Sequence, residues 1–318
     1  MRSSLVLLLF LATATLHAAE PAAVTIETGK EEIKFLAGKE LVGHYLFAPG
    51  QSRPFMKPAN APGGAPLTIA RPDGSHPHHR FLWFCHGQVI PEGIDLNGRK
   101  HVDFWMESPG SGRIVCTEVG APKLDKHQGS VVTKNEWRTA EGVKILDEAR
   151  TIHLIDLGDA RLLVFAIDLH ASVAPVTFGD TKEGSFGVRV NEIIREGGGN
   201  GRIVSAADKT GEKDTWGHKA AWCDYSGVID GKAVGVAIFD HPQNAHPACW
   251  HVRAYGLMAA NPFGRKGAFP GQKDNPNLVK LAKGEHLNLR YGVLLHTGDA
   301  KDGNVAAHFK TFAARDYE

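Results

Sequence analysis

Residues 286–296 read HLNLRYGVLLH, and this stretch decides the fold class. Its odd-numbered positions from Leu287 to Leu295 are all apolar, whereas polar His286, Asn288 and Arg290 alternate with them. A repeat of two places alternate side chains on opposite faces of an extended chain, so the segment is typical of a half-buried β-strand. Similar strand patterns occur at 24–28, 33–37, 41–47, 81–85, 114–119, 131–139, 143–155, 161–169 and 186–190.

A hairpin signal and the scarcity of helix complete the fold prediction. Asp230-Gly231 divides the strand pattern of 228–239 and suits a type I′ turn, in which both central residues have positive φ. The one convincing helix is C-terminal, where Asp302 can cap a segment with Val305 and Phe312 at helical spacing. We therefore predict an all-β protein. We expect a single large antiparallel β-sandwich over residues 20–318, comparable to the supersandwich of sugar mutarotases, with a short C-terminal helix.

The charge balance argues against a nucleic-acid partner. The chain has 318 residues, with 36 Lys and Arg against 35 Asp and Glu, so its net charge is +1. Nucleic-acid-binding proteins usually carry a basic excess on one face, and no long Lys/Arg run supplies one here. Apolar residues make up 42% of the chain, which is enough for a large core.

Residues 1–19 are predicted to be a signal peptide. Arg2 supplies a positive start, residues 5–11 form an apolar run, and small residues lead to Ala19. The apolar run is shorter than the roughly 20 residues that span a bilayer, which favours cleavage over anchoring. We expect an exported protein, periplasmic or extracellular, that has no membrane contact after cleavage.

The cysteines Cys85, Cys116, Cys223 and Cys249 leave the disulfide state open. Export would allow two disulfides in any of three pairings. Cys85 lies within the apolar run FLWFC, which favours a buried free thiol instead.

The first histidine-rich segment is SHPHHR, residues 75–80. In an extended chain His76 and His78 point to the same side, and His79 and Arg80 follow them. Imidazoles beside a guanidinium suit acid–base work and the binding of hydroxyl or carboxylate groups. The His-x-His spacing equally suits a transition metal. A polar turn whose histidines bind backbone groups is the third interpretation.

The second histidine-rich segment follows residue 239. His241 precedes a proline, and His251, Arg253 and Tyr255 share one face if the segment is a strand. Such a stripe is a hydrogen-bonding surface, although an ordinary exposed strand face would look the same. Asn261 begins the turn NPFG.

Three carboxylates and one tryptophan complete the candidate site. Asp180 and Glu183 precede the strand at 186–190, and Asp103 lies between apolar neighbours. A carboxylate so flanked is either partnered or has a raised pKa. Trp216 is the best candidate for an exposed ring on which a sugar could stack.

Several motifs together resemble the PmoA family, a group of exported bacterial proteins of unassigned function. The motifs are SHPHHR (75–80), VDFW (102–105), KEG (182–184), FDHP (239–242), WHVR (250–253) and ANPFG (260–264). The resemblance implies an exported β-rich protein, of a kind often found in organisms that degrade polysaccharides. The family label refers to a methane monooxygenase subunit, but an integral membrane enzyme needs repeated long apolar stretches, and the chain after residue 19 has none.

The leading hypothesis is a carbohydrate-processing enzyme (a hydrolase, lyase or epimerase) that takes a small sugar or glycan and needs no cofactor. Its expected catalytic residues are His78, His79, Asp180, Glu183 and His251. Its expected substrate-binding residues are His76, Arg80, Asp103, Trp216, His241, Arg253, Tyr255 and Asn261. One alternative is a redox protein with copper or another divalent metal on His76, His78 and His241. The other alternative is a non-catalytic glycan-binding module.

Overall fold

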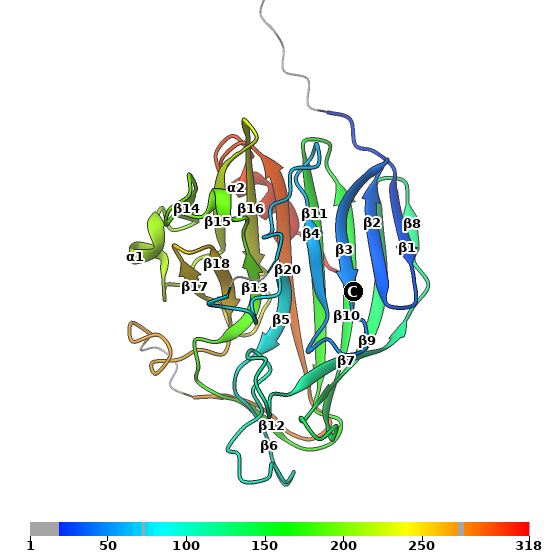
Figure 1. The fold of residues 1–318 in the computed structure, drawn as a ribbon, viewed down its shortest axis with the longest axis vertical. Coiled ribbons are helices and arrows are strands. Elements are labelled where there is room, and N and C mark those ends of the chain that lie inside the picture. Colours follow the sequence, from blue (N-terminus) through cyan, green and yellow to red (C-terminus); the bar gives the residue numbers. More distant parts are fainter. Residues whose placement is uncertain (1–18, 72–73, 273–276, 318) are drawn as a thin grey trace, which may run out of the picture.

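Two large antiparallel sheets dominate the computed structural model, which describes residues 19–71, 74–272 and 277–317 (Figure 1). The expected signal peptide therefore lies almost wholly outside the described residues. The eight-stranded sheet has the order β1 (Val24–Thr28), β2 (Glu32–Ala37), β3 (Glu40–Leu46), β4 (Phe55–Ala59), β5 (Leu82–His86), β13 (Gly184–Arg189), β18 (Leu257–Asn261), β17 (Cys249–Arg253).

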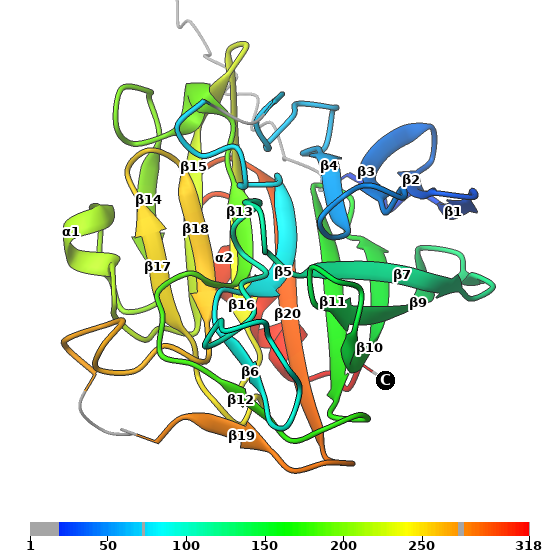
Figure 2. The ribbon, with the colours of Figure 1, turned by 60° about the horizontal axis from the view of Figure 1, so that its bottom comes forward.

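The nine-stranded sheet contains the alternating segment 286–296. Its order is β14 (Arg202–Ser205), β15 (Trp222–Ile229), β16 (Lys232–Asp240), β20 (His286–Thr297), β11 (Ala160–His170), β10 (Lys144–Asp156), β9 (Gln128–Arg138), β7 (Arg113–Val119), with β8 (Lys123–Asp125) paired to β9. A third sheet at one end of the molecule has the order β19 (Val279–Leu281), β12 (Val176–Phe178), β6 (Val89–Pro91) (Figure 2). The prediction of a large antiparallel sandwich is confirmed.

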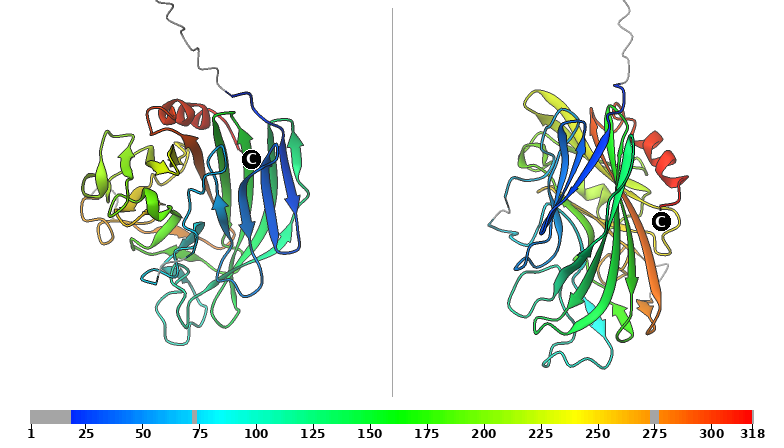
Figure 3. Two further views of the ribbon diagram at one scale, coloured as in Figure 1. Left: turned by 45° about the horizontal axis from the view of Figure 1, so that its top comes forward. Right: turned by 90° about the vertical axis from the view of Figure 1, so that its right-hand side faces the viewer.

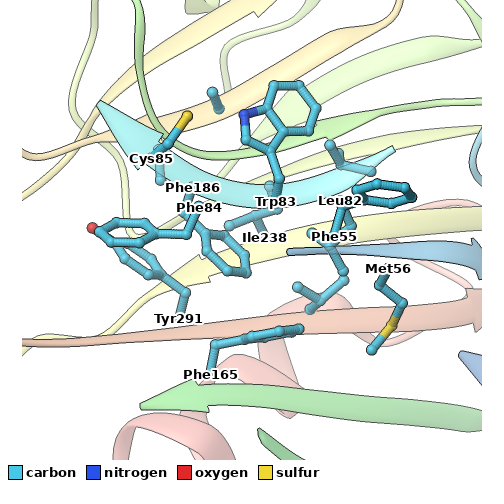
Figure 4. Packing of buried hydrophobic residues seen from close by; sticks show 14 of the residues in the cluster. Phe55, Met56, Leu82, Trp83, Phe84, Cys85, Phe165, Phe186, Ile238 and Tyr291 are labelled. Atoms are coloured by element: carbon cyan, nitrogen blue, oxygen red, sulfur yellow. The ribbon is translucent and has the colours of Figure 1, made fainter. Parts of the chain in front are cut away.

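The hydrophobic pattern of β20 sets how the two sheets pack. Its odd-numbered side chains are buried in the core between the sheets, as the alternation predicted. Phe186 of β13 reaches across and packs 5.0 Å from Phe165 and 4.8 Å from Tyr291, measured between ring centroids. Figure 4 shows that Phe84 points toward the same rings, whereas Trp83 points to the opposite side of the sheet. The eight-stranded sheet therefore has an inner face in the core and an outer face with bulky side chains of its own.

The predicted hairpin turn is present. Asp230 has φ +48° and Gly231 has φ +76°, between β15 and β16, whose strands pair as neighbours. This is the geometry that a type I′ turn requires, and Asp-Gly supplies it at little cost.

The C-terminal helix α2 (Val305–Ala313) covers part of the outer face of the nine-stranded sheet (Figure 3). Phe312 packs there with apolar side chains of β10, β11, β16 and β20 in a second hydrophobic cluster. The expected cap at Asp302 is wrong, because Asn304 precedes the first helical residue and Asp302 instead donates its backbone N–H to Asp299. Two short helical segments were not foreseen, α1 (Gly211–Thr215) and the 3-10 turn η1 (Glu192–Ile194).

All four cysteines lie in the described part of the chain and are free thiols. Burial raises the pKa of Cys85 to about 12, so this thiol stays protonated and packs as a small apolar group. No helix in the described ranges is long and apolar enough to cross a membrane.

Candidate functional site

The two histidine-rich segments meet at a cavity of about 460 Å³. Its lining residues are His76, His78, His79, Met106, Lys182, Glu183, Glu212, His251, Arg253 and Tyr255. Residues more than 170 positions apart in the sequence therefore share one site, as the sequence analysis expected for His76, His78 and His79 with His251, Arg253 and Tyr255. We refer to this cavity as the histidine cavity.

Sheet register explains why His251 and Trp83 lie on the same face of the eight-stranded sheet. In the eight-stranded sheet His251 pairs with Ala259, Ala259 with Gly187, and Gly187 with Trp83. Directly paired residues lie on the same face, so all four are on the side of this sheet that faces away from the nine-stranded sheet. Two small residues thus separate a histidine from a tryptophan. A Cβ atom on Gly187 would lie 3.2 Å from the Trp83 ring, which shows that the ring lies across this glycine.

Stacked rings form one wall of the histidine cavity. The rings of His76 and Tyr255 are 4.5 Å apart and nearly parallel, and His76 also stacks on His79 at 4.8 Å. Behind them the His79 ring lies 5.6 Å from Trp83, and the Arg189 guanidinium lies 4.6 Å from the centre of the Tyr255 ring. Each ring is supported by another, which fixes the orientation of the wall.

A buried arginine holds the histidine loop in place. Arg53 is 1% exposed and donates to the carbonyl oxygens of His78 at 2.6 Å, Phe104 at 2.7 Å and Trp105 at 2.9 Å. It therefore ties the loop at 75–80 to the VDFW segment, where the Asp103 carboxylate accepts the backbone N–H groups of Trp105 and Met106. A loop fixed by several buried hydrogen bonds presents its side chains in one geometry.

Burial lowers the pKa of three histidines of the cavity, His78, His79 and His251. It lowers the pKa of His79 to about 2, with the neighbouring His78 and His76 acting in the same direction. Burial also lowers the pKa of His251 to about 4, although Glu183 opposes this. The pKa of the less buried His78 is lowered by desolvation and by Arg53, and Glu183 again acts in the opposite direction. A neutral imidazole can donate one hydrogen bond and accept another.

Two carboxylates lie among these histidines, each held by a neighbour. Lys182 donates to Glu183 Oε1 at 2.6 Å. Glu212 of α1 accepts Arg253 Nη1 at 2.9 Å and the backbone N–H of Ala254 at 2.6 Å. Arg253 is thereby fixed at the cavity edge.

Asn261 acts on this site indirectly. It is fully buried and donates to the carbonyl oxygens of Thr181 at 2.9 Å and Lys182 at 3.3 Å. We expected Asn261 to bind substrate, but its side chain instead holds the backbone segment that carries Glu183.

Four other expected site residues lie outside the lining. Asp180 accepts the backbone N–H groups of Arg265, Gly267 and Ala268, so its oxygens stabilise a loop and do not face substrate. Asp103 is used in the turn described above. Arg80 forms an ion pair with Glu107, and its Nε donates to that carboxylate at 2.7 Å. Trp216 is no exposed platform, because Arg253 covers one side at 5.2 Å and the ring packs on Phe269.

His241 is a further correction, and it affects the metal hypothesis. Its ring packs edge-on against Phe312 of α2 at 5.0 Å and Nε2 lies 3.3 Å from the carbonyl oxygen of Arg315. The set His76, His78 and His241 therefore does not converge. In the ranges that the structure describes, no three His, Cys, Asp or Glu side chains are arranged to hold a metal ion.

Sequence reasoning missed Met106, Lys182 and Glu212. Lys182 stands beside Glu183 and could have been included with it. Glu212 gave no signal, because it lies in a five-residue helix that the pattern did not reveal and comes near Arg253 only through the packing of α1 against β17.

The chain belongs to a family of unknown function, DUF6807, whose model matches residues 32–310. The resemblance to the PmoA family stays a prediction, since this match does not carry that name. No curated protein matches the sequence.

Several solved structures share a similar arrangement at low identity. Galactose 1-epimerase from Lactobacillus acidophilus NCFM is 7% identical with a TM-score of 0.41, covering 88% of this chain and 98% of that one. The GH36 α-galactosidase AgaB from Geobacillus stearothermophilus is 11% identical with a TM-score of 0.43, covering 87% of this chain and 41% of that one. The galactosidase domain of the α-galactosidase-sucrose kinase AgaSK is 8% identical with a TM-score of 0.44, covering 87% and 42%. This chain thus spans about two fifths of the length of the two galactosidases, and the low TM-scores assign it no function.

Proposed function

We propose that this protein is a carbohydrate-processing enzyme that performs acid–base chemistry on a sugar or uronate in the histidine cavity. The observation that supports this most is the convergence of imidazoles, two carboxylates and a fixed guanidinium on one cavity of about 460 Å³. This volume lies within the range of about 300–1,000 Å³ that is usual for small-molecule sites.

His78 and Glu183 are the pair that we assign to proton transfer. Both line the cavity, and Glu183 is close enough to favour the protonated form of His78. General acid–base catalysis works best with a group whose pKa is near the working pH. His79 is less suited to this role, because its pKa of about 2 makes it a poor proton acceptor. We assign His79 and His251 to hydrogen bonds with substrate hydroxyl groups.

Arg253 and the stacked rings are assigned to substrate binding. One Arg253 nitrogen is engaged with Glu212, and a guanidinium has further N–H groups with which to bind sugar oxygens or a uronate carboxylate. Tyr255 and His76 offer an aromatic edge at the cavity mouth.

The test is Glu183→Gln, which keeps the shape of the side chain and removes its charge. The substrates are galactose and galacturonate oligosaccharides, monitored for new reducing ends, for anomer exchange by NMR, and for the conjugated double bond of an elimination product. We expect turnover to fall by about 10²–10⁴-fold, with a much smaller change in affinity. The matched control is Glu118→Gln, since Glu118 forms a similar Lys–Glu pair on the exposed surface, with Lys134 at 2.9 Å.

Two outcomes would favour the alternatives. Binding without turnover, with Glu183→Gln changing affinity only, would make the protein a glycan-binding module. Loss of activity on exhaustive chelation, restored by one equivalent of a single metal, would make it a metalloprotein. Because His241 lies at α2, that metal would need ligands other than the expected set.

We also propose that the protein is exported. The support is the pattern of residues 1–19, an arginine, an apolar run and small residues. Mass spectrometry of periplasmic or secreted protein should find a chain that begins near residue 20. A mature chain that still carried residues 5–11 would contradict export by cleavage.

A further inference from the structure

The outer face of the nine-stranded sheet carries two adjacent hollows, on the opposite side of the sandwich from the histidine cavity. One has a volume of about 500 Å³ and is lined by β8, β9, β10 and the C-terminal segment. The other has a volume of about 310 Å³ and is lined by β10, β11 and β20. Tyr317 lines both of them. We refer to the two hollows together as the back groove.

The back groove exists because the side chains on this face become small where α2 ends. Leu162, Val164 and Leu294 fill the part of the face under the helix. Further along the same strands, Thr151 pairs with Ala166, and Ala166 with Arg290. Ala149 similarly pairs with Asp168. Short side chains in adjacent rows leave a depression in a sheet face that large residues would have filled.

The C-terminal segment is fixed across this depression. Asp316 forms an ion pair with Arg290 at 2.8 Å, and the carbonyl oxygen of Arg315 lies 3.3 Å from His241 Nε2. Tyr317 stacks on Phe312 at 5.5 Å and meets the ring of His153 edge-on at 5.5 Å. An aromatic ring is thus held between the two hollows by several contacts.

The lining is polar and electrically balanced. In the larger hollow the basic Lys123 and Arg315 are matched in number by Asp125 and Asp316, and in the smaller one Arg290 is matched by Asp168. Burial lowers the pKa of His153 to about 4, so it is uncharged at neutral pH. Within the described residues, His153 Nε2 also has no hydrogen-bond partner. A charged ligand would need an excess of one sign, whereas a neutral ligand with many hydroxyl groups matches these donors and acceptors.

We propose that the back groove is a second, non-catalytic binding site for an extended neutral oligosaccharide, whose sugar units occupy the two hollows on either side of Tyr317, a buried ring (5% exposed) that lines both of them. Both hollows have the size of ordinary small-molecule sites. Their arrangement on either side of one ring suits a chain of sugar units better than a single compact molecule.

The test measures binding of neutral hexaoses of glucose, mannose and xylose, with a hexagalacturonate as the anionic comparison. Calorimetry of the purified full chain gives the affinity, and hydrogen exchange identifies the residues that the bound oligosaccharide protects. We expect a neutral hexaose to protect residues 123–130, 149–155 and 315–317. Tyr317→Ala should weaken this binding about tenfold, equivalent to about 1.4 kcal/mol, while Tyr317→Phe should retain it.

A second variant leaves the C-terminal segment untouched. Thr151→Gln places a longer neutral side chain into the smaller hollow and should also weaken binding. Its matched control is Thr117→Gln, at an exposed position of β7 outside the back groove. The proposal is overturned if no neutral hexaose binds, if only the anionic one binds, or if both Tyr317→Ala and Thr151→Gln bind as well as the wild type. Protection confined to residues 182–183 and 251–255 would overturn it too, while leaving the proposed role of the histidine cavity intact.

Discussion

The two outer faces of the sandwich each carry a hollow, but the two hollows are lined by different kinds of side chain. On the eight-stranded sheet, Gly187 and Ala259 separate His251 from Trp83, whose ring lies across the glycine. On the nine-stranded sheet, Ala149 and Ala166 line the smaller hollow. The first hollow is surrounded by imidazoles with lowered pKa values, whereas the second is lined by balanced charges with one such histidine, His153.

The difference teaches that a hollow and a reactive site have separate causes. On the back face, small residues at paired strand positions line a depression. A site for acid–base chemistry also needs loops that bring titratable groups over it, as the loop at 75–80 does for the front face. The back groove receives the C-terminal segment, which contributes the Tyr317 ring and a carboxylate, Asp316, that is already paired with Arg290.

The largest expected effect tests how tightly each hollow is packed. Gly187→Val should destabilise the protein by about 1–3 kcal/mol, because its Cβ would meet the Trp83 ring and displace His79 behind it. Ala149→Val, on the back face, should change stability by no more than about 0.5 kcal/mol. Urea unfolding followed by circular dichroism measures both. Equal costs would mean that the two hollows are packed alike.

A second pair of variants compares the asparagines that support each face. Asn261 binds the backbone carbonyls of Thr181 and Lys182 on the front. Asn244 is 5% exposed and exchanges hydrogen bonds with the backbone of Arg290 on the back, at 2.7 and 2.9 Å. Alanine at either position leaves buried backbone groups unpaired and should cost about 1–3 kcal/mol.

The two asparagine variants should differ in which backbone amides exchange faster. Hydrogen exchange should rise at residues 181–184 in Asn261→Ala and at residues 289–291 in Asn244→Ala. Asn261→Ala should also reduce turnover more than affinity, since it moves Glu183. Faster exchange on both faces in either variant would contradict the independence of the two sites.

The sequence predicted the strands well because alternation is a local property. The pattern of 286–296 and the Asp230-Gly231 turn identified their elements without any tertiary information. It predicted the front site in part, since His251 and Arg253 lie on one strand face by the same alternation. The predicted roles of three residues were wrong for one reason. Each residue is polar and lies near a motif, but its partner is distant in the sequence. The partner is a loop backbone for Asp180, Glu107 for Arg80 and α2 for His241.

Acid stability should respond alike to one histidine on each face. Burial lowers the pKa of His251 and of His153 to about 4, against an ordinary value of 6.5. Below pH about 6.5 each histidine is protonated in the unfolded chain, whereas in the folded protein it stays neutral until about pH 4. The free energy of unfolding therefore falls as the pH falls between these values. The slope is at most about 1 kcal/mol per pH unit for each.

Replacing His251 or His153 by glutamine removes the proton uptake of that side chain in the unfolded protein. His251→Gln and His153→Gln should each make stability less dependent on pH between about 4.5 and 6.5, with no such benefit above pH 7. Thermal unfolding across this range measures it. Only His251→Gln should also weaken sugar binding in the histidine cavity. An unchanged pH slope in one variant would show that its histidine is already charged in the folded protein.

The smallest expected effect concerns the ion pair at each hollow. Arg253–Glu212 on the front and Arg290–Asp316 on the back have nearly equal lengths, 2.9 and 2.8 Å, and all four side chains are partly exposed. Such pairs are worth about 0–1 kcal/mol each, so Asp316→Asn should barely change global stability. Its effect should be local, because Arg290–Asp316 fixes the segment that carries Tyr317, and exchange at residues 315–317 should rise. Glu212→Gln should cost more than Asp316→Asn, because Glu212 also accepts the Ala254 N–H at 2.6 Å and so anchors the end of β17. Equal changes in the urea midpoint for the two variants would show that this backbone hydrogen bond contributes nothing, and that the front site is no more rigidly held than the back groove.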